Sequence, residues 1–511
     1  MKRMTSGALV LAALVSIASS AAAQQPLTRD AISEAQRLRA SGDLATAASL
    51  LRSHLAQWPD DGDAARLLAQ TLYWMKDIPA ARSAYEAALA RHPEDTTLIL
   101  QYAGMLAETG QRARARELVL PLTQLPAARA GADTVLGTLA YWEGNLAAAE
   151  RLFTEALRAN PDQQDAKRQL LEILTATASW VRVSSGIRHD DQPLDRVGFG
   201  FDARWFATPL VPVTVHFEPA GYWPSGTATR KLWIADVTVA DYIPSWHVET
   251  ELAGGIIHRS YGVDAADWQG HALAGIRLTP SVALRARIER APYLYTTSSL
   301  TTPVMTQAAT GSLHLNSSRG WLGEAGYQVQ RYPDANIVTS AYAWLLVPLV
   351  HRGGNEFQLG YAVSSDTADE SRFVLVNPAQ PYLPGDPRFS TAGQYAPYYT
   401  PNNLVAHSAI GALALRTSRT TTLRLNGSYA VRATEDAPVL VVSRGQVQRT
   451  FFPHGVTPWN ARTSFEVALG SLTVAAIGDF GRTSFYSWAT AGVQVTHRFV
   501  PAGGAQSGTR R

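Results

Sequence analysis

The chain has 511 residues, enough for two or more domains, and only 17% of them are charged. The formal net charge is +3 and no cluster of Lys and Arg of the nucleic-acid-binding kind occurs, so we expect no nucleic-acid partner. The absence of cysteine excludes disulfide bonds and lipid attachment through an N-terminal cysteine.

The first 23 residues have the pattern of a secretory signal peptide. Lys2 and Arg3 provide positive charge, residues 7–18 are apolar apart from one serine, and the alanines at 21–23 supply a cleavage site. The apolar run is too short to cross about 30 Å of hydrocarbon as a helix, and no later apolar segment is longer. We therefore predict removal of residues 1–23, export of the mature chain and no helical membrane anchor.

Residues 28–163 contain four copies of a 34-residue unit. Pro59, Pro93 and Pro161 share one phase and mark position 32 of the unit, and Ala127, preceded by Pro126, stands at this position in the third copy. The aligned copies share small residues at positions 8 and 20, a large residue at position 24 and a turn residue between the two helices. These are Ala35, Ala69, Ala103 and Gly137; Ala47, Ala81, Ala115 and Ala149; Leu51, Tyr85, Val119 and Phe153; and Gly42, Lys76, Gly110 and Gly144.

These positions predict pairs of antiparallel helices. Small residues at positions 8 and 20 let the two helices approach closely, and the large residue fills the space beside them. Proline ends the second helix because it lacks an N–H group and disfavours helix in the preceding residue. The pattern resembles tetratricopeptide repeats, although the tryptophan common at position 4 is missing. Residues 164–178 are expected to form a closing helix and linker, since a terminal repeat must cover its exposed apolar face.

Aromatic pairs recur at positions 12 and 13 of the first helix in two of the repeats. They are Tyr73, Trp74, Tyr141 and Trp142. A repeat stack presents this helix along its concave side, so one interpretation is a binding groove for a polymer or peptide. The other interpretation is packing between repeats, and Ala107-Glu108 in the third repeat interrupts the row.

From Ser179 onward the apolar period changes from 3.6 to 2, which predicts β-strands. About 16 such segments predict an antiparallel barrel over residues 179–499, giving a two-domain α + β chain. The expected starts are Trp180, Val197, Val213, Leu232, Trp246, Gly270, Val282, Thr306, Trp321, Ile337, Phe357, Val405, Thr421, Thr463, Leu472 and Phe485. The signal peptide and the number of segments favour a transmembrane barrel over a soluble sandwich.

The connections between these segments alternate in length. Short ones are expected at 207–209, 243–245, 279–280, 317–319, 417–419 and 470–471. The longest are 365–402 and 433–460. If the repeats are periplasmic, all short turns fall on the periplasmic side, which is the asymmetry of outer-membrane barrels. The last segment, 493–499, ends in Phe499 and resembles the terminal strand signal of such barrels, while residues 500–511 are expected to be a disordered tail.

One face of the predicted strands is apolar, and the other is polar and charged. In a membrane barrel the polar face lines the pore. The residues expected to line it are Asp202, Arg204, Glu249, Glu251, Arg285, Arg287, Arg424 and Glu466.

The sequence has none of the common catalytic signatures. It lacks HExxH, G-x-S-x-G and Walker motifs, and its 12 histidines have no metal-ligand spacing. We expect no enzymatic activity, no metal and no cofactor.

The order of signal peptide, tetratricopeptide array and barrel resembles bacterial exopolysaccharide-export porins of the cellulose and poly-N-acetylglucosamine type. Tyr398-Tyr399-Thr400-Pro401 also resembles a Y-x-P segment of the cellulose-type barrels. The resemblance implies an outer-membrane porin surrounded by lipid, with periplasmic repeats that bind protein partners or the polymer. Two alternatives remain open: a protein-translocating barrel similar to surface-lipoprotein assembly modifiers, and a general porin with an envelope scaffold.

Overall fold

The computed structural model describes most of the chain as two compact units that divide between Leu170 and Leu171. The described residues are 31–192, 194–224, 228–260, 265–376, 390–391, 393–443 and 446–500. The predicted signal peptide (1–23) and most of the predicted tail (501–511) lie outside these ranges.

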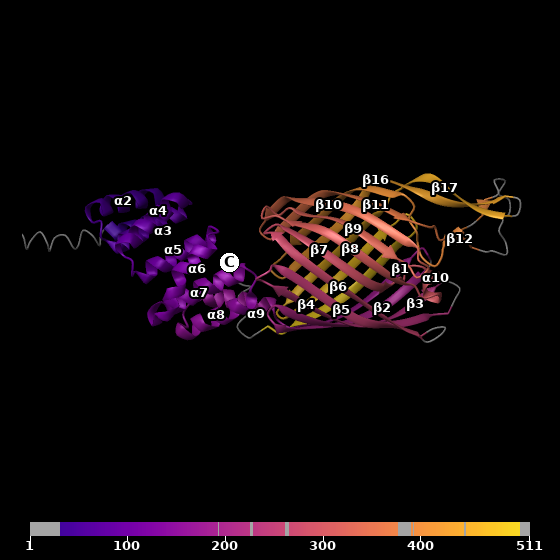
Figure 1. Ribbon diagram of the computed structural model, residues 1–511, viewed down its shortest axis with the longest axis horizontal. Helices are drawn as coiled ribbons and strands as arrows, with labels where there is room; N and C mark the ends of the chain where they lie inside the picture. The colour runs from indigo at the N-terminus through magenta and orange to yellow at the C-terminus, as the bar shows by residue number, and fades with distance from the viewer. Residues whose placement is uncertain are drawn as a thin grey trace, which may run out of the picture. The chain divides into compact units, whose positions relative to one another are not determined.

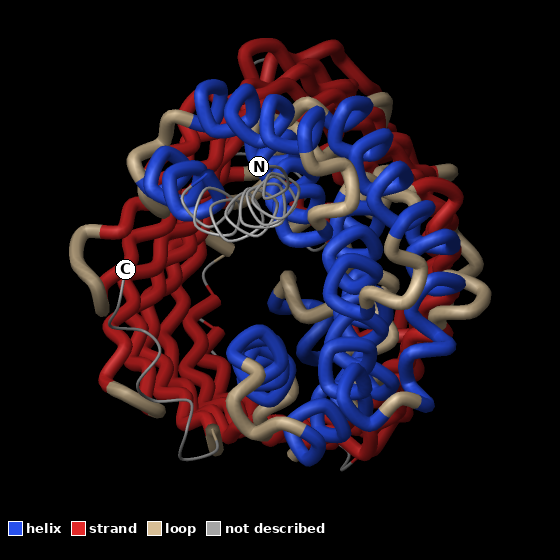
Figure 2. Tube along the Cα trace, turned by 90° about the vertical axis from the view of Figure 1, so that its left-hand side faces the viewer, coloured by secondary structure: helices blue, strands red, loops and turns tan. Residues whose placement is uncertain are grey.

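The first unit is helical, and its helices (blue in Figure 2) follow one another along a curve. Residues 31–40 form the first of them. The others are α2 (Leu44–Gln57), α3 (Gly62–Trp74), α4 (Ile78–Arg91), α5 (Thr96–Glu108), α6 (Arg112–Val119), the 3₁₀ helix η1 (Leu120–Gln124), α7 (Pro126–Trp142), α8 (Leu146–Ala159) and α9 (Gln164–Ala176), within which the boundary between the two units falls. The helices form four antiparallel pairs, with α9 after them, which confirms the predicted tetratricopeptide array.

Helix starts and turns follow local chemistry. Asp61 and Asp95 each cap a helix by accepting hydrogen bonds from its first free backbone N–H groups, as Asp43, Asp77 and Asn145 also do. Between the paired helices, Gly42, Gly110 and Gly144 have φ angles of +88°, +89° and +79°. Lys76 takes the same left-handed conformation, with φ of +64°, so the turn keeps its shape without glycine.

The predicted repeat positions form the core of this unit. The alanines at positions 8 and 20 and the large residues at position 24 are buried throughout. Gly137 shows why position 8 must be small, because a Cβ atom there would lie 2.6 Å from the Phe153 ring. A larger residue would therefore push the paired helices apart.

The third repeat differs from the expected pattern. Pro59, Pro93 and Pro161 follow the ends of α2, α4 and α8, but Pro126 is the first residue of α7. The second helix of this repeat ends early, at Val119, and continues as the 3₁₀ helix that contains Pro121. Proline cannot donate the next helical hydrogen bond, so Pro121 rather than Pro126 accounts for the end of α6.

The second unit is a closed antiparallel barrel of 16 strands (Figure 1). Its strands are β1 (Trp180–Asp190), β2 (Leu194–Thr208), β3 (Val211–Pro224), β4 (Arg230–Ile243), β5 (Val248–Arg259), β6 (Ala265–Thr279), β7 (Val282–Pro292), β8 (Met305–Asn316), β9 (Leu322–Arg331), β10 (Ile337–Arg352), β11 (Asn355–Ala368), β15 (Leu404–Arg416), β16 (Thr421–Ser443), β18 (Trp459–Leu469), β19 (Leu472–Arg482) and β20 (Ser487–Arg498). Each strand pairs with its neighbours in sequence, and β1 pairs with β20 to close the barrel.

The predicted count of strands is confirmed, and every predicted start falls within five residues of an observed one. The short connections all lie at one end of the barrel, which we call the turn end. Gly353 and Gly354 form a further turn there, with φ of +61° and +83°. The chain enters β1 and leaves β20 at the turn end, since Trp180 pairs with Arg498.

The opposite end, which we call the loop end, carries the longer connections. The connection predicted over 433–460 is not a loop: β16 continues to Ser443, and β17 (Gln446–Val456) pairs back along it. Apolar residues in both halves, such as Val439 and Phe452, favour this hairpin. The loop end also carries α10 (Thr297–Thr301), β12 (Phe373–Leu375), β13 (Ser390–Thr391) and β14 (Gly393–Tyr395). We call the described residues between β11 and β15 the strap.

Candidate functional site

The eight predicted pore-lining residues lie on one face of the barrel sheet. Residues directly opposite each other on paired strands share a face, and the register carries this parity from strand to strand. Asp202 and Arg204, on β2, form hydrogen bonds with side chains of β3. The distance is 2.8 Å between Asp202 and His216 and also 2.8 Å between Arg204 and Thr214. We call this surface the polar face.

Charges on the polar face are arranged in opposite pairs. Arg285 pairs with Glu249, and Arg287 lies 2.8 Å from Glu289 and 3.9 Å from Glu251. On the other side of the barrel, Arg424 lies 2.5 Å from Glu466. All eight predicted residues thus have a charged or hydrogen-bonding partner, and the face is rich in charge without a large local excess of either sign.

A cavity of about 470 Å³ opens on the polar face of five consecutive strands, β6 to β10. Arg287, Glu289, His314, Gln330 and Tyr342 are among its lining residues. The mixture of guanidinium, carboxylate, imidazole, amide and phenol groups offers many hydrogen-bond donors and acceptors. Such a surface suits contact with water or a hydrated ligand.

The opposite face is apolar and exposed. Phe201, Leu252, Ile288, Tyr429 and Val493 are each 45–65% exposed in the middle of their strands. Exposed aromatic residues also gather at both ends of this face: Trp205, Trp246, Trp321, Phe357 and Phe499 at the turn end, and Trp223, Trp268, Trp459 and Phe480 at the loop end. An apolar band between two aromatic girdles is the surface pattern typical of barrels that span a bilayer.

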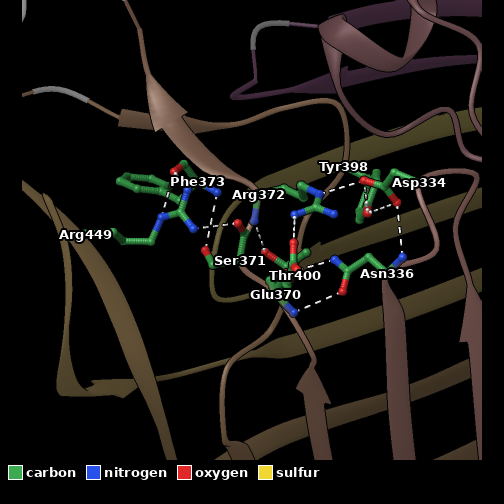
Figure 3. A network of polar contacts seen from close by, with 9 residues as sticks. All are labelled: Asp334, Asn336, Glu370, Ser371, Arg372, Phe373, Tyr398, Thr400 and Arg449. Carbon is green, nitrogen blue, oxygen red and sulfur yellow. Dashed lines mark hydrogen bonds and ion pairs between the residues drawn. The ribbon is translucent and has the colours of Figure 1, made fainter. Parts of the chain in front are cut away.

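At the loop end, the strap is held by a polar network around Asp334 (Figure 3). The Tyr398 hydroxyl donates a hydrogen bond shared between the two Asp334 carboxylate oxygens, at 2.7 and 2.8 Å, and the Arg372 guanidinium lies 2.6 Å from the same group. Tyr398 is fully buried, and its ring stacks on Tyr332 with centroids 3.6 Å apart. The network connects the strap to the β9–β10 turn.

The same network fixes the backbone of the strap (Figure 3). The Asn336 side chain donates to the Glu370 carbonyl at 2.8 Å and accepts from the Glu370 N–H at 3.0 Å. Arg449, on β17, donates to the carbonyls of Ser371 and Phe373 at 2.7 Å. These bonds satisfy backbone groups of strap residues that lie outside the barrel sheet.

The network also shifts the acidity of its members. Burial acts to raise the pKa of Asp334, but hydrogen bonds from Tyr398, Arg372 and the Asn336 N–H outweigh it and hold that pKa below its ordinary value. Burial and the bond to Asp334 raise the pKa of Tyr398 to about 12. Both groups are therefore in the states that the hydrogen bond requires at neutral pH.

A second set of contacts ties the strap to two other connections. Tyr399 stacks on Phe485 of the β19–β20 turn, with centroids 4.0 Å apart, and its N–H donates to the Tyr293 hydroxyl at 3.1 Å. The Thr296 hydroxyl donates to the Pro397 carbonyl. One segment thus contacts the β7–β8, β9–β10 and β19–β20 connections, and it crosses between them.

In the repeat unit, the four groove aromatics differ in environment. Tyr73 and Tyr141 are half-buried, and the Tyr73 hydroxyl donates to Glu108 of the next repeat. Trp74 and Trp142 are 48% and 38% exposed. Arg39 lies over the Trp74 ring at 4.1 Å, and Arg112 over the Trp142 ring at 5.9 Å. The contact at Tyr73 agrees with packing between repeats, whereas both tryptophan side chains remain partly exposed to solvent.

The aromatic girdles and the loop-end tyrosines are not among the predicted site residues, although Trp246, Trp321 and Phe357 are predicted strand starts and Tyr398 belongs to the Y-x-P segment. The girdles can be found from the sequence, because their residues stand at the ends of the predicted strands and alternate in phase with the apolar residues. Tyr293, Tyr332 and Tyr398 carry no periodic signal, since they lie in connections and meet only through the closure of the barrel.

No helix among the described residues is long and apolar enough to cross a membrane. Nor, in the part of the chain that the structure describes, do three His, Asp or Glu side chains gather where they could hold a metal ion.

Comparison with known proteins supports the repeat unit directly. A tetratricopeptide-repeat family model matches residues 38–87. No curated protein matches the chain by sequence. The chain therefore joins a tetratricopeptide-repeat array to a closed 16-stranded antiparallel barrel.

Several solved structures are similar to parts of the chain. A bacterial polysaccharide outer-membrane secretin aligns with 63% of this chain and 99% of its own, at 8% identity and a TM-score of 0.44. Pseudomonas aeruginosa PilF aligns with 30% of this chain and 69% of its own, at 22% identity and a TM-score of 0.27. The type IV pilus biogenesis factor PilW aligns with 29% of this chain and 68% of its own, at 18% identity and a TM-score of 0.27.

Proposed function

We propose that the chain is an outer-membrane export porin whose barrel conducts an exopolysaccharide and whose repeats act as a periplasmic docking domain. In this proposal the polar face lines the lumen and the apolar face contacts lipid. The periplasmic repeats bind protein partners or the polymer itself.

The observation that carries the proposal is the division of the barrel into two unlike faces. The apolar face has exposed aliphatic side chains between two aromatic girdles, and the other face has paired charges and a polar cavity. Barrels of about 16 strands leave an aqueous channel, whereas those of about eight strands are filled by their own side chains. These two properties together support a water-filled passage through a bilayer.

The pairing of charges favours a hydrated and weakly charged cargo. Arg285 and Arg287 are each neutralised by nearby carboxylates, so the wall offers hydrogen bonds without a strong field of one sign. A polymer rich in hydroxyl groups can exchange such bonds as it moves, because each is weak enough to break. A highly charged chain would meet both attraction and repulsion along the same wall.

The barrel ends support the orientation. The chain enters and leaves the barrel at the turn end, where the connections are short. Outer-membrane barrels have short periplasmic turns and longer extracellular loops. This arrangement supports a periplasmic location for the repeats and an extracellular location for the strap and the β16–β17 hairpin.

The proposal is tested by deleting the gene in its native host and measuring polysaccharide on and outside the cells. We expect extracellular polymer to fall and periplasmic polymer to accumulate, with both reversed by a plasmid copy of the full chain. Unchanged polymer with loss of a surface protein would instead assign the barrel to protein translocation. Unchanged polymer with slower uptake of small solutes would assign it to general diffusion.

A further inference from the structure

Tyr295 stands where two cavities of the barrel meet. It lies in the β7–β8 connection, is 45% exposed, and lines both the 470 Å³ cavity and a second cavity of about 300 Å³. Both volumes fall in the range of about 300–1,000 Å³ that is usual for small-molecule sites. The ring is therefore accessible from two polar spaces at the loop end.

The position of Tyr295 is fixed by the residues that follow it. Thr296 caps α10, where its hydroxyl accepts from the Ser299 N–H at 3.1 Å, and it also donates to Pro397 of the strap. Leu300 is fully buried and anchors the short helix against the barrel wall. A ring held in this way loses little conformational entropy when a ligand binds to it.

A cationic side chain flanks the ring. The Arg188 guanidinium lies 5.7 Å from the ring centres of Tyr295, Tyr486 and Trp488, and 3.3 Å from the Tyr486 hydroxyl. Asp190, which is 1% exposed, lies 3.7 Å from Arg188 and orients it. Donor groups therefore point toward the same space as the aromatic surface.

Most of the charges around both cavities stand in opposite pairs, and the remaining carboxylate, Glu324, accepts a hydrogen bond from the Tyr342 hydroxyl at 2.7 Å. Arg287 pairs with Glu289 on one side of Tyr295, and Arg196 pairs with Glu218 on the other. Each pair keeps free lone pairs and N–H groups for a ligand but adds no net charge. The site is thus suited to an uncharged molecule with many hydroxyl groups.

We propose that Tyr295 is the stacking platform of a binding subsite for an uncharged sugar ring of the exported polymer. The C–H groups on one face of a pyranose are slightly positive and pack against the negative face of an aromatic ring. The hydroxyl groups at the ring edge then hydrogen-bond to charged side chains that line the same cavities as Tyr295, such as Glu289 and Arg188. This inference rests on the proposed export function and names the chemistry of its cargo.

The test is calorimetric titration of the full-length protein in detergent micelles with cellohexaose and with the hexamer of N-acetylglucosamine. Because Trp74 and Trp142 are a second set of exposed rings, all variants carry Trp74→Ala and Trp142→Ala. We expect Tyr295→Ala to weaken binding of the better hexamer by about tenfold. Tyr295→Phe keeps the ring and should bind within about threefold of the parent.

The matched control is Tyr327→Ala. Tyr327 is 53% exposed, but its parity places it on the apolar face, so its removal should leave sugar binding unchanged. Equal binding by Tyr295→Ala and the parent would overturn the proposal, as would an equal loss in Tyr327→Ala. Tighter binding of a polyanionic or a fully deacetylated cationic hexamer would overturn the assignment to an uncharged sugar.

Failure of this inference is distinguishable from failure of the export function. If no hexamer binds the parent protein while deletion of the gene still abolishes polymer export, the Tyr295 subsite is wrong and the function stands. If export is unaffected by the deletion, the function itself is wrong, whatever the titrations give.

Discussion

The Tyr398 hydroxyl donates one hydrogen bond that is shared between the two carboxylate oxygens of Asp334, which lie at 2.7 and 2.8 Å. The two residues come from different connections, the strap and the β9–β10 turn. A tyrosine buried in a loop usually needs a partner for its hydroxyl, because an unsatisfied buried polar group is costly. This contact therefore couples the position of the strap to the rim of the barrel.

Tyr398→Phe should loosen the strap without unfolding the barrel. The substitution removes the shared hydrogen bond to Asp334 but keeps the ring that stacks on Tyr332, and a hydrogen bond to a charged group contributes about 1.5–3 kcal/mol. We expect protease added to intact cells to cleave within 365–402 faster than in the unmodified protein. Tyr429→Phe on the apolar face is the control and should not change the rate.

The same digestion reports orientation. Protease outside intact cells should cleave the strap or the β16–β17 hairpin and leave residues 28–163 whole. Fragments cut within the repeats, from cells that retain their periplasmic marker enzymes, would contradict the periplasmic location of that domain.

Acid should weaken the attachment of the strap. The pKa of Asp334 is held below its ordinary value of 3.8, so its contribution is fully present above that value and is lost as pH falls through the lower folded-state pKa. Deuterium uptake at residues 393–403, corrected for intrinsic exchange, should rise below about pH 4. Asp334→Asn should show faster deuterium uptake at neutral pH and little further increase on acidification. If uptake in this variant rises with acid as much as in the unmodified protein, another group causes the acid response.

Removing cations from the polar face should change ion selectivity. Arg285→Gln together with Arg287→Gln leaves Glu249, Glu251 and Glu289 without these partners, so the reversal potential in a KCl gradient should shift toward cation selectivity. Glu249→Gln with Glu251→Gln should shift it the opposite way. If the arginines instead faced lipid, where midplane Arg costs about 2–4 kcal/mol, their removal would stabilise the heat-modifiable barrel and leave selectivity unchanged.

The exposed tryptophans of the repeats should contribute little to stability. Trp74→Ala and Trp142→Ala remove side chains that are 48% and 38% exposed, so we expect each to lower the free energy of unfolding by under about 1 kcal/mol. Phe153→Ala removes a fully buried ring and should cost about 3–5 kcal/mol. Urea denaturation followed by helical circular dichroism measures both, and a large loss at the tryptophans would assign them to packing.

The periodic parts of the fold are predictable from sequence because their physics is local. Positions such as Ala81 and Phe153 recur every 34 residues, and the alternation of residues along each strand is enough to assign Arg285 and Glu249 to one face. The strap and the hairpin are not predictable in this way. Tyr398 contacts Asp334, and Tyr295 lines two cavities, only because the 16 strands close into a barrel. Neither residue belongs to a repeating pattern in the sequence.

In the third repeat, too, the sequence pattern does not predict one structural detail. Pro126 stands one residue from the repeat phase, and the phase alone suggests that it ends a helix. The nearby Pro121 has already ended α6, which leaves Pro126 free to begin α7. Either of two nearby prolines could end the second helix of this repeat, and the repeat spacing does not show which one does.

The central claim is that the polar face lines an aqueous passage, and neighbouring residues on β8 test it most directly. Thr310 lines the larger cavity and Ala309 lies on the opposite face of the same strand. The chain has no cysteine, so Thr310→Cys and Ala309→Cys each introduce the only thiol. In planar bilayers, a water-soluble, positively charged thiosulfonate should reduce the conductance of Thr310→Cys, reversibly with dithiothreitol, and leave Ala309→Cys unchanged. Modification of Ala309→Cys with Thr310→Cys unreactive would contradict the claim.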